Sequence, residues 1–142
     1  MVNDIVNGIT KAIYEEYGKE YKIYTESIEQ GFKEPCFFVA VLDGEQTRIV
    51  GNRYQRNIPI DVHYFPSEKA KSKEMNSVAQ ALYGILERIT LADGTMLNGF
   101  QMSDKPVNGV LHFFVTYKPI LTYQTAEETN MGEVAVNAKA VD

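Results

Sequence analysis

The sequence predicts an α+β domain, in which two amphipathic helices pack on one face of a mainly antiparallel sheet and an extended C-terminal tail follows. Two segments repeat apolar residues at helical spacing, whereas several others alternate or form short apolar runs bounded by turn residues. These segments follow one another as a helix, several strands, a second helix, two strands and a tail. A chain of 142 residues that is 44% hydrophobic is long enough to bury one core of this kind.

The first helix is predicted over residues 3–17. Its apolar residues recur every four positions, which is the spacing of a one-sided stripe: Ile5, Ile9, Ile13 and Tyr17. Asn3 is expected to cap its start and Gly18 to end it. A short strand is expected over residues 21–27, because "YKIYTES" alternates and is rich in residues that favour strands.

Three further strands are predicted in the middle of the chain. The dense apolar run of residues 36–43 favours a central strand that ends at the Asp43–Gly44 turn. Residues 45–50 and 53–65 are expected to form the next two strands. Pro59 has no backbone N–H, so the last of them is expected at an edge of the sheet, or with this position turned away from its neighbour.

The second helix is predicted after Pro66, with Ser67 as its cap. Its apolar stripe is the clearest periodic pattern in the sequence and comprises Met75, Val78, Ala79, Leu82, Ile85, Leu86 and Ile89. Residues 91–103 and 109–121 are then expected to form two more strands, joined by the turn-rich "DKPVNG". Both faces of the last strand are apolar, which predicts a central, buried position.

The domain is expected to comprise residues 1–123, and residues 124–142 are expected to form a C-terminal tail. The tail lacks aromatic residues and has few large apolar ones, so it adds little to a core. Within it, "EVAVNAKAV" alternates small apolar with polar residues, as a strand does. We therefore expect this segment to need an edge that another chain supplies.

The formal net charge of −5 comes without any block of Lys or Arg. This balance argues against a protein whose affinity depends on phosphate contacts, although not against a surface that DNA passes without binding. The chain opens without a secretion signal and has no apolar run of the roughly 18 residues that span a bilayer. We expect a soluble protein that is made inside the cell and has no membrane partner.

No set of ionisable residues has the spacing of a catalytic or metal site. His63 and His112 lie in two predicted strands that sheet pairing could bring together, with Asp61 as a third ligand or an orienting group. Without a His-x-x-His or Glu-x-x-His spacing, ordinary strand histidines are the expected interpretation. The single Cys36 lies in the most apolar run, where a thiolate is disfavoured. The sequence therefore predicts no enzyme, no bound metal and no cofactor.

The composition points toward association with other proteins. The nine Tyr and seven Phe are more than a core of this size needs, and aromatic residues on a sheet surface are common at protein interfaces. The candidates for a subunit or partner interface form two groups: Arg48, Arg53, Tyr54 and Arg56 around a predicted turn, and Val134 and Val136 in the tail. The basic group suits an acidic partner or nucleic acid, although a charged hairpin rim is the commoner meaning of such a cluster.

The order of these elements, and the sequence around them, resembles the phage tail terminator family of contractile-tailed phages and phage-tail-like bacteriocins. The resemblance covers residues 1–123. The segments that carry it are "NDIVNGITKAIYEEY", "FFVAVL" with the basic hairpin after it, "IPIDVHYFPS" leading into "MNSVAQALYGILERI", and "GVLHFFVTYKPIL".

The resemblance implies a structural protein without enzymatic activity. Such a protein forms a homo-oligomeric ring, expected to be a hexamer, that sits on the last ring of the tail tube and stops its polymerisation. Its implied partners are the tail tube protein and, beside it, sheath and connector or collar proteins, with at most passive contact to DNA in the channel. It would be synthesised in the bacterial cytoplasm and end in the assembled phage or phage-tail-like particle. Another head–tail joining or tail-completion protein is the alternative, and a small nucleic-acid-binding module is a more distant one.

Overall fold

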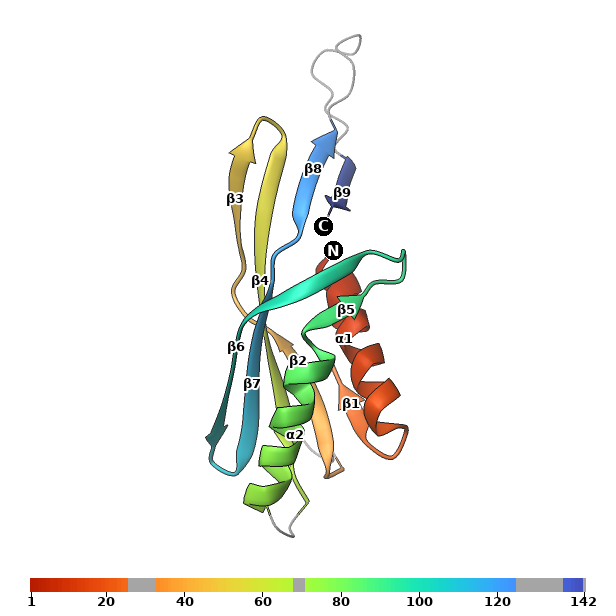
Figure 1. The fold of residues 1–142 in the computed structure, drawn as a ribbon, viewed down its shortest axis with the longest axis vertical. Coiled ribbons are helices and arrows are strands. Elements are labelled where there is room, and N and C mark those ends of the chain that lie inside the picture. The colour runs from red at the N-terminus through yellow and green to blue at the C-terminus, as the bar shows by residue number, and fades with distance from the viewer. Residues whose placement is uncertain (26–32, 68–70, 125–136, 142) are drawn as a thin grey trace.

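The computed structural model describes residues 1–25, 33–67, 71–124 and 137–141. Within these ranges the chain forms two α-helices and nine β-strands, as Figure 1 shows. In chain order the elements are α1 Val2–Tyr17, β1 Lys22–Tyr24, β2 Cys36–Val41, β3 Glu45–Val50, β4 Arg53–Phe65, α2 Lys71–Ile85, β5 Arg88–Thr90, β6 Met96–Val107, β7 Val110–Tyr117, β8 Ile120–Gln124 and β9 Asn137–Val141. Among the described residues, no helix is both long and apolar enough to cross a membrane.

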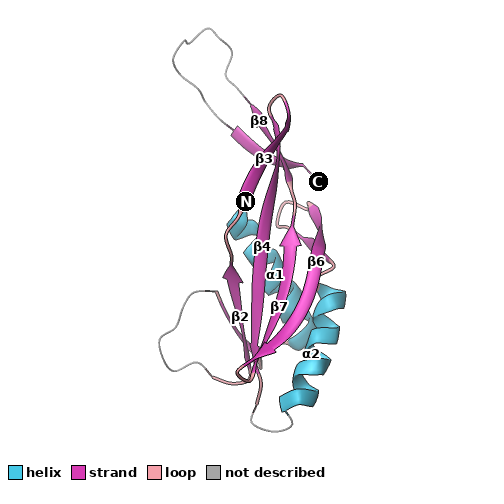
Figure 2. Cartoon of the chain, turned by 90° about the vertical axis from the view of Figure 1, so that its left-hand side faces the viewer, coloured by secondary structure: helices cyan, strands magenta, loops and turns pink. Residues whose placement is uncertain are grey.

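The strands form one curled sheet that is almost entirely antiparallel. Its main run of strands is β1-β2-β4-β7-β6-β5, and among the described residues only β1 and β2 pair in parallel. Both helices cover the same face of this sheet, as the view in Figure 2 shows. The predicted α+β class, with two helices on one face of a mainly antiparallel sheet, is therefore confirmed.

The longest strand, β4, belongs to two parts of the sheet. Its C-terminal half pairs with β2 on one side and β7 on the other. Its N-terminal part, residues 53–57, pairs instead with β3 and β8, and β9 continues the sheet beyond β8. We call β3, residues 53–57, β8 and β9 the arm, because they extend past the helices (Figure 1), and we call the rest of the molecule the body.

The core lies between the helices and the covered face of the sheet. Its largest fully buried side chains come from both layers and are Tyr64, Tyr117, Phe37, Phe113, Ile5, Ile9, Ile13, Ile58, Ile60, Leu82, Leu86 and Ile89. This set contains three residues of the stripe predicted for the first helix and the centre of the stripe predicted for the second. Periodic burial on one side of each helix is thus what holds both helices on the sheet.

The predicted end of α1 is confirmed, whereas its predicted N-terminal cap is wrong. Asn3 is not the cap, because α1 already begins at Val2 and the carbonyl of Met1 accepts a hydrogen bond from the Ile5 N–H at 3.1 Å. No side-chain cap is formed there. Gly18 ends the helix as predicted, with a φ of 78° that a residue without a Cβ adopts most easily.

The second helix is shorter than its predicted stripe. α2 ends at Ile85, whereas Ile89 lies in β5 and pairs with Leu97 of β6. Ile89 is nevertheless fully buried. The step of three residues from Leu86 to Ile89 fits a helix, but a buried strand position takes the same apolar side chain, and periodicity alone does not separate the two.

The strands in the middle of the chain follow the predictions, and those after α2 are shifted. β2, β3 and β4 lie where they were expected. β1 lies in the first half of residues 21–27, of which 26 and 27 are outside the described residues. β6 begins later than predicted, because the Leu91 N–H donates to the Thr95 carbonyl at 2.7 Å across a turn. It also continues through most of "DKPVNG" before the chain turns into β7.

The last predicted strand, residues 109–121, is in fact two strands. β7 lies between β4 and β6, which confirms its central position. The chain then breaks at Lys118–Pro119, and the Pro119 carbonyl accepts a hydrogen bond from the Arg56 N–H at 3.0 Å. β8 follows and pairs with the arm part of β4. Because Pro119 interrupts the hydrogen-bond ladder, the first part of this apolar segment lies in the body as β7 and the second part lies in the arm as β8.

Pro59 does not place β4 at an edge, so that alternative is wrong. β4 lies between β2 and β7 at the centre of the body. The Pro59 carbonyl accepts a hydrogen bond from the Leu42 N–H at 2.9 Å, beyond the last β2 pair, Val41 with Ile60. Since the N and O atoms of one strand residue face the same side, the Pro59 nitrogen faces the connection between β2 and β3 and away from β7. A central strand therefore tolerates this proline.

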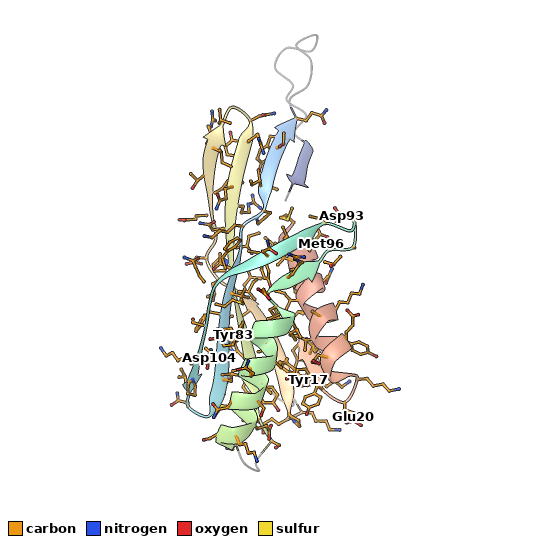
Figure 3. The ribbon with its side chains drawn as sticks, in the orientation of Figure 1. Tyr17, Glu20, Tyr83, Asp93, Met96 and Asp104 are labelled. Carbon is orange, nitrogen blue, oxygen red and sulfur yellow. The ribbon has the colours of Figure 1, made fainter. Side chains whose placement is uncertain are left out.

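Two tyrosines tie α2 and its C-terminal end to the sheet. The Tyr83 hydroxyl donates to Asp104 Oδ1 of β6 at 2.6 Å, and Figure 3 shows the two side chains together. The Tyr83 ring meets the Phe113 ring edge-on, with 4.8 Å between centroids. The buried Tyr117 hydroxyl donates to the Leu86 carbonyl at 2.7 Å. These bonds satisfy the polar ends of rings whose apolar bodies fill the core.

The junction between β4 and α2 is held by the carboxylate of Glu74. The Tyr64 hydroxyl donates to it at 2.5 Å, and Ser67 donates through its hydroxyl at 2.5 Å and its N–H at 2.8 Å. Burial alone would raise the pKa of Glu74, but these donors outweigh burial and the pKa lies below its ordinary value. Ser67, predicted as the cap, thus contacts the first described turn through Glu74, and residues 68–70 lie outside the described residues.

Changing Glu74 to glutamine is expected to lower the free energy of unfolding by about 1 kcal/mol at neutral pH, because an amide accepts these hydrogen bonds more weakly than a carboxylate does. The folded-state pKa is depressed, so this stabilisation is present above the ordinary carboxyl pKa and is lost as the pH falls through the folded-state pKa. Urea unfolding of both proteins from neutral to acidic pH should show the difference shrinking. A difference that stays constant on acidification would contradict this explanation.

Candidate assembly surfaces

The arm carries most of the interface residues predicted from the sequence. Arg48 of β3 pairs directly with Tyr54 of β4, and its guanidinium carbon lies 5.3 Å from the centre of the Tyr54 ring. This is the distance at which a cation is attracted to an aromatic face. The structure therefore holds one arginine of the predicted cluster over the ring of Tyr54, the tyrosine that belongs to the same cluster.

Arg56 is held on the same face of the arm by a small polar network. Its Nη2 donates to Gln46 Oε1 at 3.0 Å, and the Tyr123 hydroxyl donates to the same oxygen at 3.1 Å. The Tyr54 and Tyr123 rings meet edge-on with 5.1 Å between their centroids. Three strands, β3, β4 and β8, thus contribute to one ordered face in which cationic and aromatic groups alternate.

The structure does not bring the whole predicted cluster together. Arg53 lies one residue before Tyr54 on β4, so its side chain belongs to the opposite face of the arm. Arg48, Tyr54 and Arg56 share a face, because 54 and 56 are two residues apart and Arg48 pairs with Tyr54. Val134 and Val136 lie outside the described residues. Their part in an interface stays a prediction.

Exposed apolar side chains mark two places that the sequence analysis did not single out. At the tip of the arm, Ile49 is 49% exposed and Val50 is 63% exposed. At the base of the arm, an open groove of about 300 Å³ is lined by Val2, Val41, Leu42, Gly44, Glu45, Gln46, Arg56 and Ile58. In the sequence, each place is marked by two adjacent apolar residues just before a turn, where polar residues are usual. These pairs are Ile49 and Val50 at the tip, and Val41 and Leu42 at the base.

The sheet face that the helices leave uncovered is the second surface that sequence reasoning missed. Its central part carries aromatic rings from β2, β4 and β7, all of them half-buried: Phe38, Phe65 and Phe114. Between them lie two histidines, His63 and His112, which are cross-strand partners with 4.3 Å between ring centroids. Asp61, His63 and His112 were singled out from the sequence, but the aromatic residues around them were not.

A buried carboxylate joins the two histidines. Asp61 Oδ2 lies 2.9 Å from His63 Nε2 and 3.0 Å from His112 Nδ1. Burial alone would raise the pKa of Asp61, but the hydrogen bonds and charges of the two histidines outweigh burial, and the pKa lies below its ordinary value. The juxtaposition that sheet pairing was expected to allow is therefore present, with Asp61 as the shared acceptor.

Cys36 is unsuited to nucleophilic chemistry. It is fully buried, and burial, with a smaller contribution from the charge of Glu34, raises the pKa of its thiol to about 11. The thiolate is therefore scarce at neutral pH. The predicted inert, buried thiol agrees with this environment.

The geometry of the arm and of the open sheet face suits contact with other proteins, and sequence comparison names the kind of protein. The family model of the phage tail terminator protein matches residues 4–130. The chain belongs to this family. The match confirms the resemblance to phage tail terminator proteins, and it includes α1 from Asp4 onward, every strand of the body and all of β8. No curated protein matches the chain.

Proposed function

We propose that this phage tail terminator protein forms a ring, most simply of six subunits, on the end of a tail tube. The ring stops polymerisation of the tube and offers a docking face to the neck or collar. Its role is structural and not enzymatic. The observation that carries the proposal is the family match over residues 4–130, which includes every strand that builds the body and the β8 side of the arm.

The two apolar places on the arm support a contact between adjacent subunits. A closed ring needs two different surfaces on each subunit, because every subunit contacts the next one head to tail. The arm tip presents Ile49 and Val50, and the groove at the arm base is lined by apolar side chains such as Val41 and Leu42. The tip projects and the base is hollowed, so the tip of one subunit and the base of the next form a complementary pair.

The charges of the arm support a protein contact over a contact with DNA. The chain has a net charge of −5, and six copies multiply this acidity around the ring. Arg48 and Arg56 are therefore attracted to an acidic neighbouring protein, such as the next subunit or the tail tube. A bore for DNA works better without strongly basic walls. We expect the Arg48 and Arg56 face to lie against protein and not to line the channel.

Reversing the charges of Arg48 and Arg56 to glutamate is expected to reduce incorporation of the protein into tails by at least about tenfold, because each like-charge contact in an interface costs on the order of 1 kcal/mol or more. Lys105→Glu is the matched control, since Lys105 is an exposed cation on β6 far from the arm and should leave incorporation unchanged. Tails produced by cells that lack the wild-type copy are purified, and the subunit is quantified by mass spectrometry.

Tail length read by electron microscopy tests the proposed function directly. Cells that lack the protein should produce tubes of uncontrolled length, and wild-type protein supplied from a plasmid should restore a single length. Tubes of normal length without the protein would contradict a terminating role and would favour the tail-completion or head–tail joining alternative. Incorporation that is unaffected by both charge reversals would show that the arm face does not contact a partner.

A further inference from the structure

We propose that Asp61, His63 and His112 form a binding site for one divalent transition-metal ion, with Zn²⁺ as the best match, on the sheet face that the helices leave uncovered. Sequence spacing predicted no metal, but the folded chain brings the three side chains together from two adjacent central strands. The inference concerns each chain by itself and does not depend on ring formation or on tail termination.

The donor set has the composition of a zinc site. It offers two imidazole nitrogens and one carboxylate oxygen, the same groups that hold zinc in sites with three protein ligands and an open fourth position. Imidazole nitrogens favour Zn²⁺ and other late transition metals over Mg²⁺ or Ca²⁺, which prefer oxygen ligands.

The ligand atoms converge closely enough for one ion. They all lie within 4.8 Å of one another, and the two oxygen–nitrogen separations are 2.9 Å and 3.0 Å. Bonds of about 2.0–2.2 Å in a tetrahedral site place neighbouring ligand atoms roughly 3.3 Å apart. Small rotations of the three side chains are enough to widen the 2.9 Å and 3.0 Å separations to this value. In the bound state each imidazole carries its proton on the ring nitrogen that does not bind the ion.

The surroundings of Asp61 favour the binding of a cation. The residue is only 7% exposed, and its Oδ1 atom is buried without a hydrogen-bond partner among the described residues. A buried ionised carboxylate is costly unless a positive charge compensates it. The two histidines contact only Oδ2. A divalent ion bound at Oδ2 supplies a positive charge directly beside the carboxylate.

The site is both shielded and accessible. Aromatic rings flank the histidines, with centroid distances of 5.6 Å from Phe38 to His63 and 6.3 Å from Phe114 to His112. Such an apolar border lowers the local dielectric and strengthens the attraction between the carboxylate and a cation. The His63 and His112 side chains remain 23% and 21% exposed, so an ion can enter from the solvent side of the sheet. The same side is open to a fourth ligand, such as water.

The test uses the full-length chain without a polyhistidine tag, stripped with a chelator and titrated with Zn²⁺ by calorimetry and with Co²⁺ by visible absorption. One ion per chain is expected, with the intense visible bands of a four-coordinate Co²⁺ site and their loss when Zn²⁺ displaces Co²⁺. Replacing a ligand, in His63→Gln, His112→Gln or Asp61→Asn, is expected to weaken binding by more than the roughly 10–100-fold that loss of an outer-shell partner costs.

Lys105→Gln serves as the matched control, because Lys105 is the cross-strand neighbour of His112 on β6 but is not a ligand. It should keep the one-to-one complex. Circular dichroism of every variant shows whether it is folded, and because the two histidines are partly exposed, their glutamine variants keep the test valid if Asp61→Asn unfolds. Absence of a stoichiometric complex with the wild-type chain would overturn the proposal, and so would equal affinity in wild type and the folded histidine variants.

Discussion

Replacing Leu82 with alanine is expected to lower the free energy of unfolding by about 2–5 kcal/mol. Leu82 is fully buried at the centre of the α2 stripe and belongs to the one hydrophobic cluster that joins both helices to the sheet. Truncation removes apolar surface from the core and leaves a cavity that the rigid sheet below cannot close. Denaturant unfolding followed by circular dichroism measures the loss, read from the midpoint at constant slope.

Gln80→Ala provides the control for this measurement. Gln80 is an exposed residue of α2, so its replacement leaves the core intact and is expected to change the stability by less than about 0.5 kcal/mol. If Leu82→Ala changed the stability as little as Gln80→Ala does, α2 would not be held on the sheet through this face. The fold described above would then be wrong in the placement of α2.

The parts of the fold that the sequence predicted are those in which a local pattern has one structural meaning. Ile5, Ile9 and Ile13 recur every four residues with polar residues midway between them, which favours a stripe on a helix over a strand face, and all three are fully buried. The apolar run at the start of β2 and the turn residues around it likewise placed β2, β3 and β4 correctly. A period sustained over several turns, or an apolar run bounded by turn residues, needs no knowledge of the rest of the chain.

The errors come from positions whose conformation is decided by a distant neighbour. Ile89 continued the helical spacing, but pairing with Leu97 made it part of a strand. Pro59 allowed either an edge strand or a position turned away from its neighbour, and the second holds, because its nitrogen faces the connection between β2 and β3, where the central strand β4 needs no donor. In both cases the local sequence permits two structures, and the tertiary pairing selects one.

The candidate sites also divide into features that the local sequence predicts and features that only the pairing of distant strands decides. The basic hairpin was visible because its residues are close in sequence, although alternation puts Arg53 on the face opposite Arg56. The carboxylate between His63 and His112 depends on the register of β4 with β7, which brings Asp61 close to His112, 51 positions away in the sequence. Sequence spacing suggested that these residues could meet, but not that one oxygen would lie within 3.0 Å of both rings. Convergence of this kind is a property of the sheet and not of a motif.

The C-terminal strand forms the outer side of the arm, which corrects one expectation about the tail. The segment "EVAVNAKAV" was expected to need an edge from another chain, but its described part, β9, pairs with β8 of the same chain. The register runs from Ile120 with Val141 to Gln124 with Asn137. Among the described residues β9 pairs on one side only, so its outer edge is free to receive hydrogen bonds from an adjacent protein in the particle.

Deleting residues 124–142 is expected to leave the protein folded but to abolish its stable incorporation into the particle. The fold survives because Tyr123 remains held to the Gly51–Asn52 turn: its N–H donates to the Asn52 carbonyl at 2.9 Å and its carbonyl accepts from Asn52 Nδ2 at 2.6 Å. Incorporation fails because the arm loses the strand whose edge faces outward. Circular dichroism melts test the first part, and subunit quantification in purified tails tests the second.

A full-length chain in which Val134 and Val136 are changed to threonine separates two explanations of that loss. Threonine has nearly the shape of valine and keeps the backbone able to pair, but it replaces one methyl group with a hydroxyl, so this variant weakens the apolar side-chain contacts. If the tail acts through strand pairing, the variant should incorporate like wild type while the deletion fails. If the threonine variant and the deleted protein both fail to incorporate, the side chains of Val134 and Val136 make the interface contact that was predicted from the sequence. Normal particles from the deleted protein would show that the tail has no part in assembly.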